Sequence, residues 1–185
     1  MESVGWAQVT IVTGPARSGK SEWAESLARR SGRSVIYIAT SQLDPADAEW
    51  ADRVAQHRQR RPVEWQSWDV PIELGAALAT VPEGSCVLVD SLGTWAANWL
   101  DRPAADWQQA CEALQTVCAQ TRSMLIFVAE ETGWGIVPAF PSGRLFRDRL
   151  GRLVRDLGSQ SGACYLVTAG FAVNLRVIGT ALVDL

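Results

Sequence analysis

The chain has 185 residues, which is enough for one domain with a well-buried core and short for two. Its composition, 48% hydrophobic and 20% charged, is that of a globular protein and excludes a disordered one. The formal net charge of -3 argues against a nucleic-acid partner, because proteins that bind nucleic acids carry a basic surplus.

The sequence also argues against membrane insertion and secretion. No apolar run reaches the roughly 18 residues that a membrane-spanning helix needs. The stretch MESVGWAQVT has no basic segment followed by an apolar one, as a signal peptide would, so we expect a cytoplasmic protein. The four cysteines form no C-x-x-C pair and the chain has one histidine, so we expect no zinc site; Cys86 and Cys164 fit small core residues.

Short apolar runs alternate with amphipathic stretches along the chain. The apolar runs suit strands buried on both faces of a parallel sheet, and they span residues 9–13, 34–40, 86–90, 124–130 and 164–170. The amphipathic stretches predict helices over 21–32, 46–61, 72–81, 106–122 and 143–160. This order predicts one α/β domain over residues 1–185, with a mostly parallel sheet and helices on both faces. The tail, 171–179, is a candidate for a last, antiparallel strand.

The segment GPARSGKS, residues 14–21, leaves the first apolar run and opens the first helix. It matches G-x-x-x-x-G-K-[ST], in which glycines let backbone N–H groups turn into one hollow that binds phosphate. Lys20 supplies a charge for the outer phosphates, and the Ser21 hydroxyl is placed to bind Mg²⁺. The other expected nucleotide contacts in this loop are Gly14, Pro15, Ala16, Arg17, Ser18 and Gly19. With the order of elements, the loop predicts a single-domain P-loop NTPase of RecA-like fold.

An acidic residue ends the third apolar run. Asp90 lies at the carboxyl end of a buried strand, where α/β sheets bind their ligands. It is a candidate to hold Mg²⁺ through water or to accept hydrogen bonds from a nucleotide base. The structural alternative is a helix N-cap, for which Ser91 is a competing candidate.

The single histidine, His57, lies among arginines in the segment VAQHRQRRP. One interpretation is a solvent-facing residue on a basic patch. The other is catalytic, because a neutral imidazole is a good nucleophile toward phosphorus. The neighbouring arginines disfavour its protonated form and would stabilise phosphate oxygens. His57 is therefore a candidate to form a phosphoramidate intermediate.

Taken in order, several segments resemble one family: GPARSGKS, YIATSQ, a histidine shortly before R-P, VDSLGTWAANWL, ETGWGIVP and FRDRLGRL. The chain resembles the bifunctional adenosylcobinamide kinase/adenosylcobinamide-phosphate guanylyltransferase family of cobalamin biosynthesis, over about residues 8–178. The resemblance implies that the γ-phosphate of ATP or GTP is first transferred to the aminopropanol hydroxyl of adenosylcobinamide. GMP is then moved from GTP onto that phosphate, which gives adenosylcobinamide-GDP and pyrophosphate.

The resemblance also implies roles for residues outside the phosphate loop. The family's histidine before R-P carries GMP covalently, which implies this role for His57. A place near guanine is implied for Asp90, whose carboxylate would accept hydrogen bonds from N1 and the exocyclic amine. Further nucleotide contacts are implied for Ala39, Thr40, Ser41, Arg58, Gln59, Arg60, Arg61 and Asp69. The family implies a homo-oligomer, a trimer.

The chain departs from the family's pattern in its second half. Glu130 stands where the family usually has asparagine, Val154-Arg155 replaces a common N-Q pair, and AFPSG (139–143) is an unexpected insert. A generic P-loop small-molecule kinase, a guanylyltransferase without kinase activity and a RecA-like nucleotide-dependent regulator remain the alternatives.

Two groups of tryptophans need an interpretation. Trp95 and Trp99, spaced i and i+4, fit the core or a subunit interface. Trp134, flanked by glycines in ETGWGIVP, fits either packing or a platform for a large flat ligand.

Overall fold

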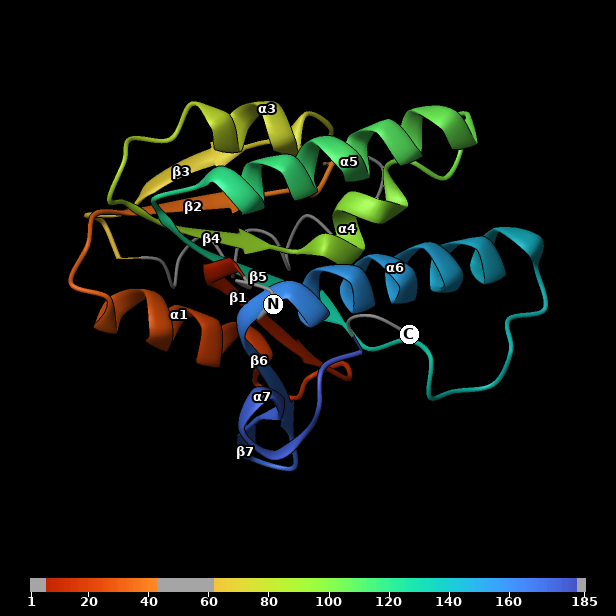
Figure 1. The fold of residues 1–185 in the computed structure, drawn as a ribbon. Helices are drawn as coiled ribbons and strands as arrows, with labels where there is room; N and C mark the ends of the chain where they lie inside the picture. The colour runs from red at the N-terminus through yellow and green to blue at the C-terminus, as the bar shows by residue number, and fades with distance from the viewer. Residues whose placement is uncertain (1–5, 43–61, 183–185) are drawn as a thin grey trace.

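The computed structural model describes residues 6–42 and 62–182, which form a seven-stranded sheet in the order β3-β2-β4-β5-β1-β6-β7 (Figure 1). Every neighbouring pair is parallel except β6 and β7, which are antiparallel. The strands are β1 (Trp6–Gly14), β2 (Val35–Ala39), β3 (Gln66–Asp69), β4 (Cys86–Asp90), β5 (Met124–Glu130), β6 (Ser161–Thr168) and β7 (Phe171–Asn174). The predicted α/β fold with a mostly parallel sheet is confirmed.

Helices cover both faces of this sheet (Figure 1). One face carries α1 (Lys20–Arg30), which packs through Ala24 and Ala28. The other face carries α3 (Leu74–Ala79), α4 (Leu92–Ala97), α5 (Ala104–Gln120) and α6 (Pro141–Gln160). A short α7 (Leu175–Ile178) follows β7. None of the helices in the described ranges is long and apolar enough to cross a membrane.

Side chains on the two faces of the central strands belong to two separate hydrophobic cores. In β4, Val87 and Val89 join the core beneath α3 to α6, whereas Cys86 and Leu88 join the core beneath α1. Because side chains alternate across a strand, a strand covered on both sides must be apolar at every position. This requirement explains why the predicted strands are continuous apolar runs.

A cluster of tryptophans fills the space between α4, α5 and α6. Trp95 and Trp99 are 0% and 5% exposed, and Trp107 packs on both, with ring centroids 5.1 Å and 6.3 Å away. The indole N–H of Trp95 donates to the carbonyl of Ile72 at 2.8 Å. Buried indoles need such a partner, and here it also anchors the segment before α3. Of the two expectations for Trp95 and Trp99, the core is therefore correct within this chain.

Several elements differ from the sequence-based expectations. The structure adds β3 and α4, which were not predicted. Helix α6 begins at Pro141 rather than near 143, because proline suits the first helical position. The antiparallel strand expected in the tail is confirmed for β7, but residues 175–178 form a helix instead of extending it. The helix expected over 46–61 lies outside the described residues.

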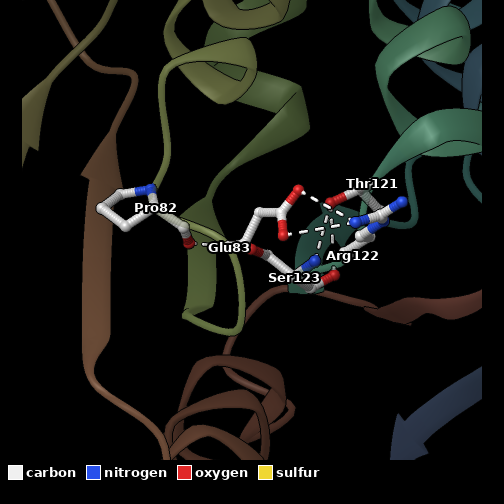
Figure 2. Close-up of polar contacts among 5 residues, drawn as sticks. All are labelled: Pro82, Glu83, Thr121, Arg122 and Ser123. Carbon is white, nitrogen blue, oxygen red and sulfur yellow. Dashed lines mark hydrogen bonds and ion pairs between the residues drawn. The ribbon is translucent and has the colours of Figure 1, made fainter.

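The amino ends of β4 and β5 are joined by polar contacts between the turns that precede them (Figure 2). Ser123 Oγ donates to the carbonyl of Pro82 at 3.0 Å, and the Ser123 N–H donates to Thr121 Oγ1 at 3.0 Å. The Arg122 guanidinium faces the Glu83 carboxylate at 3.4 Å, with both side chains largely exposed. These contacts hold β4 and β5 in register at the end of the sheet opposite to Asp90.

Candidate nucleotide site

The carboxyl ends of the parallel strands gather most of the predicted site residues that the structure describes. Ala39 pairs with Asp69 of β3 on one side and with Asp90 of β4 on the other. Gly14 of β1 pairs with Glu130 of β5. Since β5 lies between β1 and β4, the phosphate loop and Asp90 are separated by one strand, whose last residue is Glu130. In α/β sheets this edge is where ligands bind.

The phosphate loop is shaped by backbone that favours glycine. Gly19 has φ 89° and is the N-cap of α1, and Arg17 has φ 59°. A Cβ on Gly14 would overlap the carbonyl oxygen of Val167 on the neighbouring strand β6. Among the described residues no side chain caps the amino end of α1, so its first N–H groups are available to an anion.

Several polar groups around this loop are available to a phosphate ligand. Within residues 6–42 and 62–182, Lys20 Nζ donates only a long hydrogen bond of 3.4 Å, to the carbonyl of Pro15. The hydroxyls of Thr13 and Ser18 are buried without a hydrogen-bond partner in the described part of the chain. Ser21, the second residue of α1, is partly exposed at the helix start. Buried hydroxyls without partners are rare in native proteins, and a ligand in the loop would supply the missing partners.

Asp90 is oriented by neighbours on β2. The hydroxyl of Tyr37 donates to Asp90 Oδ2 at 3.0 Å. The Thr40 hydroxyl donates to the carbonyl of Ser91 at 2.7 Å and accepts from the Ser91 N–H at 3.0 Å. Asn98 in turn holds the carbonyl of Thr40 at 2.7 Å. The corner after Asp90 is therefore fixed to the end of β2, and Ser91 rather than Asp90 is the N-cap of α4.

Glu130 is a site residue to which the sequence alone assigned no role. Its Oε1 accepts a hydrogen bond of 2.6 Å from Ser91 Oγ, whereas its Oε2 is buried and has no hydrogen-bond partner in the described ranges. Burial raises the pKa of Glu130, the nearby Asp90 raises it further, and the Ser91 hydrogen bond and Lys20 oppose the rise. The sequence pattern could have indicated Glu130, because this residue ends an apolar run in the same way as Asp90 does.

The remaining predicted site residues differ in how exposed they are, and some lie outside the described residues. Thr40 is fully buried and its hydroxyl is engaged with Ser91, and Asp69 is exposed at the end of β3. Ser41 follows directly on Thr40 and is partly exposed. The nucleophile candidate and its neighbours lie outside the described residues; these are His57, Arg58, Gln59, Arg60 and Arg61.

A loop of this kind, between a parallel strand and a helix, is the phosphate-binding element of P-loop NTPases. The sheet, its covering helices and the loop together define a P-loop enzyme that acts on nucleotides. Residues 10–175 match the model of the family described as cobinamide kinase / cobinamide phosphate guanyltransferase. The chain belongs to this family, and it is a kinase and guanylyltransferase of adenosylcobalamin biosynthesis.

Curated relatives support the same assignment over most of the chain. The bifunctional adenosylcobalamin biosynthesis protein CobP of Pseudomonas aeruginosa is 37% identical over 170 residues, which cover 90% of this chain and 96% of that protein. The bifunctional adenosylcobalamin biosynthesis protein CobU of Escherichia coli is 34% identical over 181 residues, with 90% and 98% covered. The protein of the same name from Salmonella typhimurium is 30% identical over 181 residues, with the same shares covered.

The fold is also similar to that of a solved structural-project protein from Pyrococcus horikoshii OT3. The TM-score is 0.57 at 6% sequence identity, over 97% of this chain and 89% of that one. At so low an identity the similarity concerns the fold alone.

Proposed function

We propose that both reactions use the phosphate loop of residues 14–21 to bind the nucleotide and that GMP passes through a covalent adduct on His57. The observation that carries this proposal is the loop itself, in which Lys20 and two buried hydroxyls without partners in the described residues lie at a helix start that no side chain caps. Such an arrangement suits a bound triphosphate. The family match over residues 10–175 supplies the two reactions.

In the kinase step, the acceptor hydroxyl oxygen of adenosylcobinamide attacks the γ-phosphorus of ATP or GTP. The bond from that phosphorus to the β–γ bridging oxygen breaks, the nucleoside diphosphate leaves and the hydroxyl proton is released. Lys20 would stabilise the charge on the transferred phosphoryl oxygens. The loop amides would hold the phosphates in line for the attack.

In the guanylyl step, a neutral nitrogen of His57 attacks the α-phosphorus of GTP and pyrophosphate leaves. An oxygen of adenosylcobinamide phosphate then attacks the same phosphorus, the P–N bond breaks and His57 is regenerated. Arg58, Gln59, Arg60 and Arg61 are proposed to contact the phosphates during this exchange. Asp90, oriented by Tyr37, is proposed to accept hydrogen bonds from guanine, which adenine could not supply in the same pattern.

Mg²⁺ fits the residues present at the loop. We propose that the Ser21 hydroxyl binds it at the start of α1, since oxygen donors are the ligands that Mg²⁺ prefers. When bound, the ion neutralises charge on the β- and γ-phosphates. Ala39, Thr40, Ser41 and Asp69 are proposed to line the nucleotide site from the ends of β2 and β3.

Labelled GTP tests the covalent adduct. The protein is incubated with GTP labelled at the α-phosphate or, separately, at the γ-phosphate, and is then denatured. The α-label should stay on the wild-type chain, survive alkali and be lost in acid, and His57→Asn should remove it. Absence of the α-label from the wild type, or its persistence in His57→Asn, would contradict the proposal and leave a plain P-loop kinase.

We also propose that the protein is cytoplasmic and that it forms a homotrimer, the oligomer that the family resemblance implies. Large apolar side chains are exposed on β7 and α7, namely Phe171, Val177 and Ile178. Exposed apolar side chains gathered in one region are typical of protein interfaces. Light scattering coupled to size exclusion should give about three times the 20.1 kDa chain mass, and a monomer mass would contradict the proposal.

A further inference from the structure

Glu130 connects the phosphate loop with the corner that carries Asp90. It is the register partner of Gly14, and the N–H of the next residue, Glu131, donates to the Gly14 carbonyl at 2.9 Å. On its other side, the Glu130 carboxylate accepts the 2.6 Å hydrogen bond from Ser91, which directly follows Asp90. One residue therefore links β1, through β5, to the end of β4.

The packing around Glu130 is fitted to its carboxyl group. Gly93, in the first turn of α4, is buried, and a Cβ at this position would overlap the Oε2 and Cδ atoms of Glu130. Glycine is a poor residue inside a helix, so its presence here needs a local reason. The space that Gly93 leaves open is the space that the carboxyl group fills.

This arrangement is unfavourable for stability. Oε2 is buried without a hydrogen-bond partner in the described residues, and an unmet buried acceptor costs free energy. The Asp90 carboxylate lies close enough to raise the pKa of Glu130, which adds like-charge repulsion. Buried polar groups that destabilise the fold are common at functional sites, because an arrangement that serves activity is often not the most stable one.

We propose that Glu130 is a positioning residue for nucleotide binding and turnover: by holding the Ser91 hydroxyl, it sets the place of Asp90 relative to the phosphate loop. The Ser91 hydroxyl has one proton, and the hydrogen bond directs it to Glu130 Oε1, while Ser91 Oγ accepts from the N–H of Thr94 at 3.3 Å. Ser91 is thereby held from both sides. The inference rests on the proposed nucleotide site at residues 14–21 and does not depend on the adduct at His57.

Two substitutions separate the hydrogen bond from the charge. Glu130→Gln keeps an oxygen that can accept from Ser91 but removes the charge, whereas Glu130→Met keeps the unbranched shape and removes the acceptor. Glu83→Gln is the matched control, because Glu83 is an exposed carboxylate in the turn before β4, at the end of the sheet opposite to Glu130. The measurements are the melting temperature, the Kd for GTP by calorimetry, and kcat/KM for transfer of the γ-phosphate.

We expect Glu130→Met to melt at the wild-type temperature or above it. Its kcat/KM and its affinity for GTP should both fall, each by about 10-fold or more. Glu130→Gln should stay within about 3-fold of the wild type in both quantities, as should Glu83→Gln. In a Ser91→Ala background, Glu130→Met should add little further loss, because the bond it breaks is already absent.

Three results would overturn the proposal. The first is a Glu130→Met protein with wild-type affinity and kcat/KM. The second is a Glu130→Gln protein as impaired as Glu130→Met, since the charge rather than the hydrogen bond would then be required. The third is an undiminished effect of Glu130→Met in the Ser91→Ala background. The α-label test of His57 is independent of all three, so a failure of one proposal can be told from a failure of the other.

Discussion

Gly14 and Val167 approach each other so closely that no side chain fits between them: a Cβ on Gly14 would overlap the carbonyl oxygen of Val167. This contact lies where the phosphate loop leaves β1 and passes the end of β6. The start of the phosphate loop therefore packs directly against the backbone of the neighbouring strand β6. The position of the loop depends on the absence of a side chain at Gly14.

Gly14→Ala should displace the loop or β6, because neither backbone segment can make room for a methyl group without a cost in free energy. We expect a loss of about 1–3 kcal/mol in the free energy of unfolding. Nucleotide affinity should fall more steeply than stability does, because the loop amides must converge on the phosphates. Chemical denaturation and GTP calorimetry on the same preparation check both expectations. A variant with wild-type affinity would contradict the role given to this contact.

Lys20→Ala should abolish nucleotide turnover while leaving the fold intact. In the described part of the chain its ammonium makes one long hydrogen bond, to Pro15, so little stability is lost with it. Loss of a charge that stabilises the transferred phosphoryl group should lower kcat by about 100-fold or more. Steady-state assays and a thermal melt provide the test. Turnover that persists in a folded Lys20→Ala protein would place the nucleotide elsewhere.

Glu130 should make stability depend on pH. Burial raises the pKa of its carboxyl above the ordinary value of 4.5, so the folded state binds the proton more tightly than the unfolded state. The contribution of the protonated Glu130 carboxyl to the stability of the folded state is thus fully present below pH 4.5 and is lost as the pH rises through the raised pKa. The melting temperature of Glu130→Gln, measured relative to the wild type, should therefore increase as the pH rises above 4.5. A constant difference would contradict the predicted rise.

Trp95→Ala should destabilise the fold more than the loss of any surface contact. Trp95 is fully buried, packs on Trp99 and Trp107, and donates to the Ile72 carbonyl. We expect a loss of about 3–5 kcal/mol, as for other large-to-alanine changes in packed cores. Urea denaturation measures the loss. A change below about 1 kcal/mol would mean that the tryptophan cluster does not stabilise the fold as its packing indicates.

Breaking the exposed pair of Glu83 and Arg122 should have little effect. Their side chains are 74% and 77% exposed, and solvent screens such pairs. Glu83→Gln should change the free energy of unfolding by less than about 1 kcal/mol and leave turnover unchanged. The hydrogen bond from Ser123 to Pro82 keeps the two turns joined in this variant. A large loss of stability would show that register at this end depends on charge.

Buried strands and the phosphate loop could be predicted because each has a strong local cause. The strands covered on both faces must be apolar throughout, and the loop needs its glycines, lysine and serine at fixed spacing. Strand β3 has no such cause, since its four residues lie at the edge and are mostly exposed. Helix α4 has six residues, too few for a periodic pattern, although Ser91 is recognisable as a possible cap beside Asp90.

The site could be predicted in part for similar reasons. Asp90 and Glu130 both end apolar strands, yet only Asp90 was predicted to bind the nucleotide, because the pattern does not tell which strands become neighbours. That β5 lies between β1 and β4 is a property of the sheet, not of any local segment. The engagement of the Thr40 hydroxyl with Ser91 depends on the same strand order and could not be inferred from the IATSQ segment.

The backbone that supports Gly14 belongs to β6, and β6 turns directly into β7 and the exposed apolar side chains of the sheet's last edge. A molecule bound against β7 would therefore lie one strand, β6, away from Gly14 and the start of the phosphate loop. A displacement of β6 from that edge would act on Gly14 through main-chain contact, because the Val167 carbonyl oxygen leaves no room for a Cβ there.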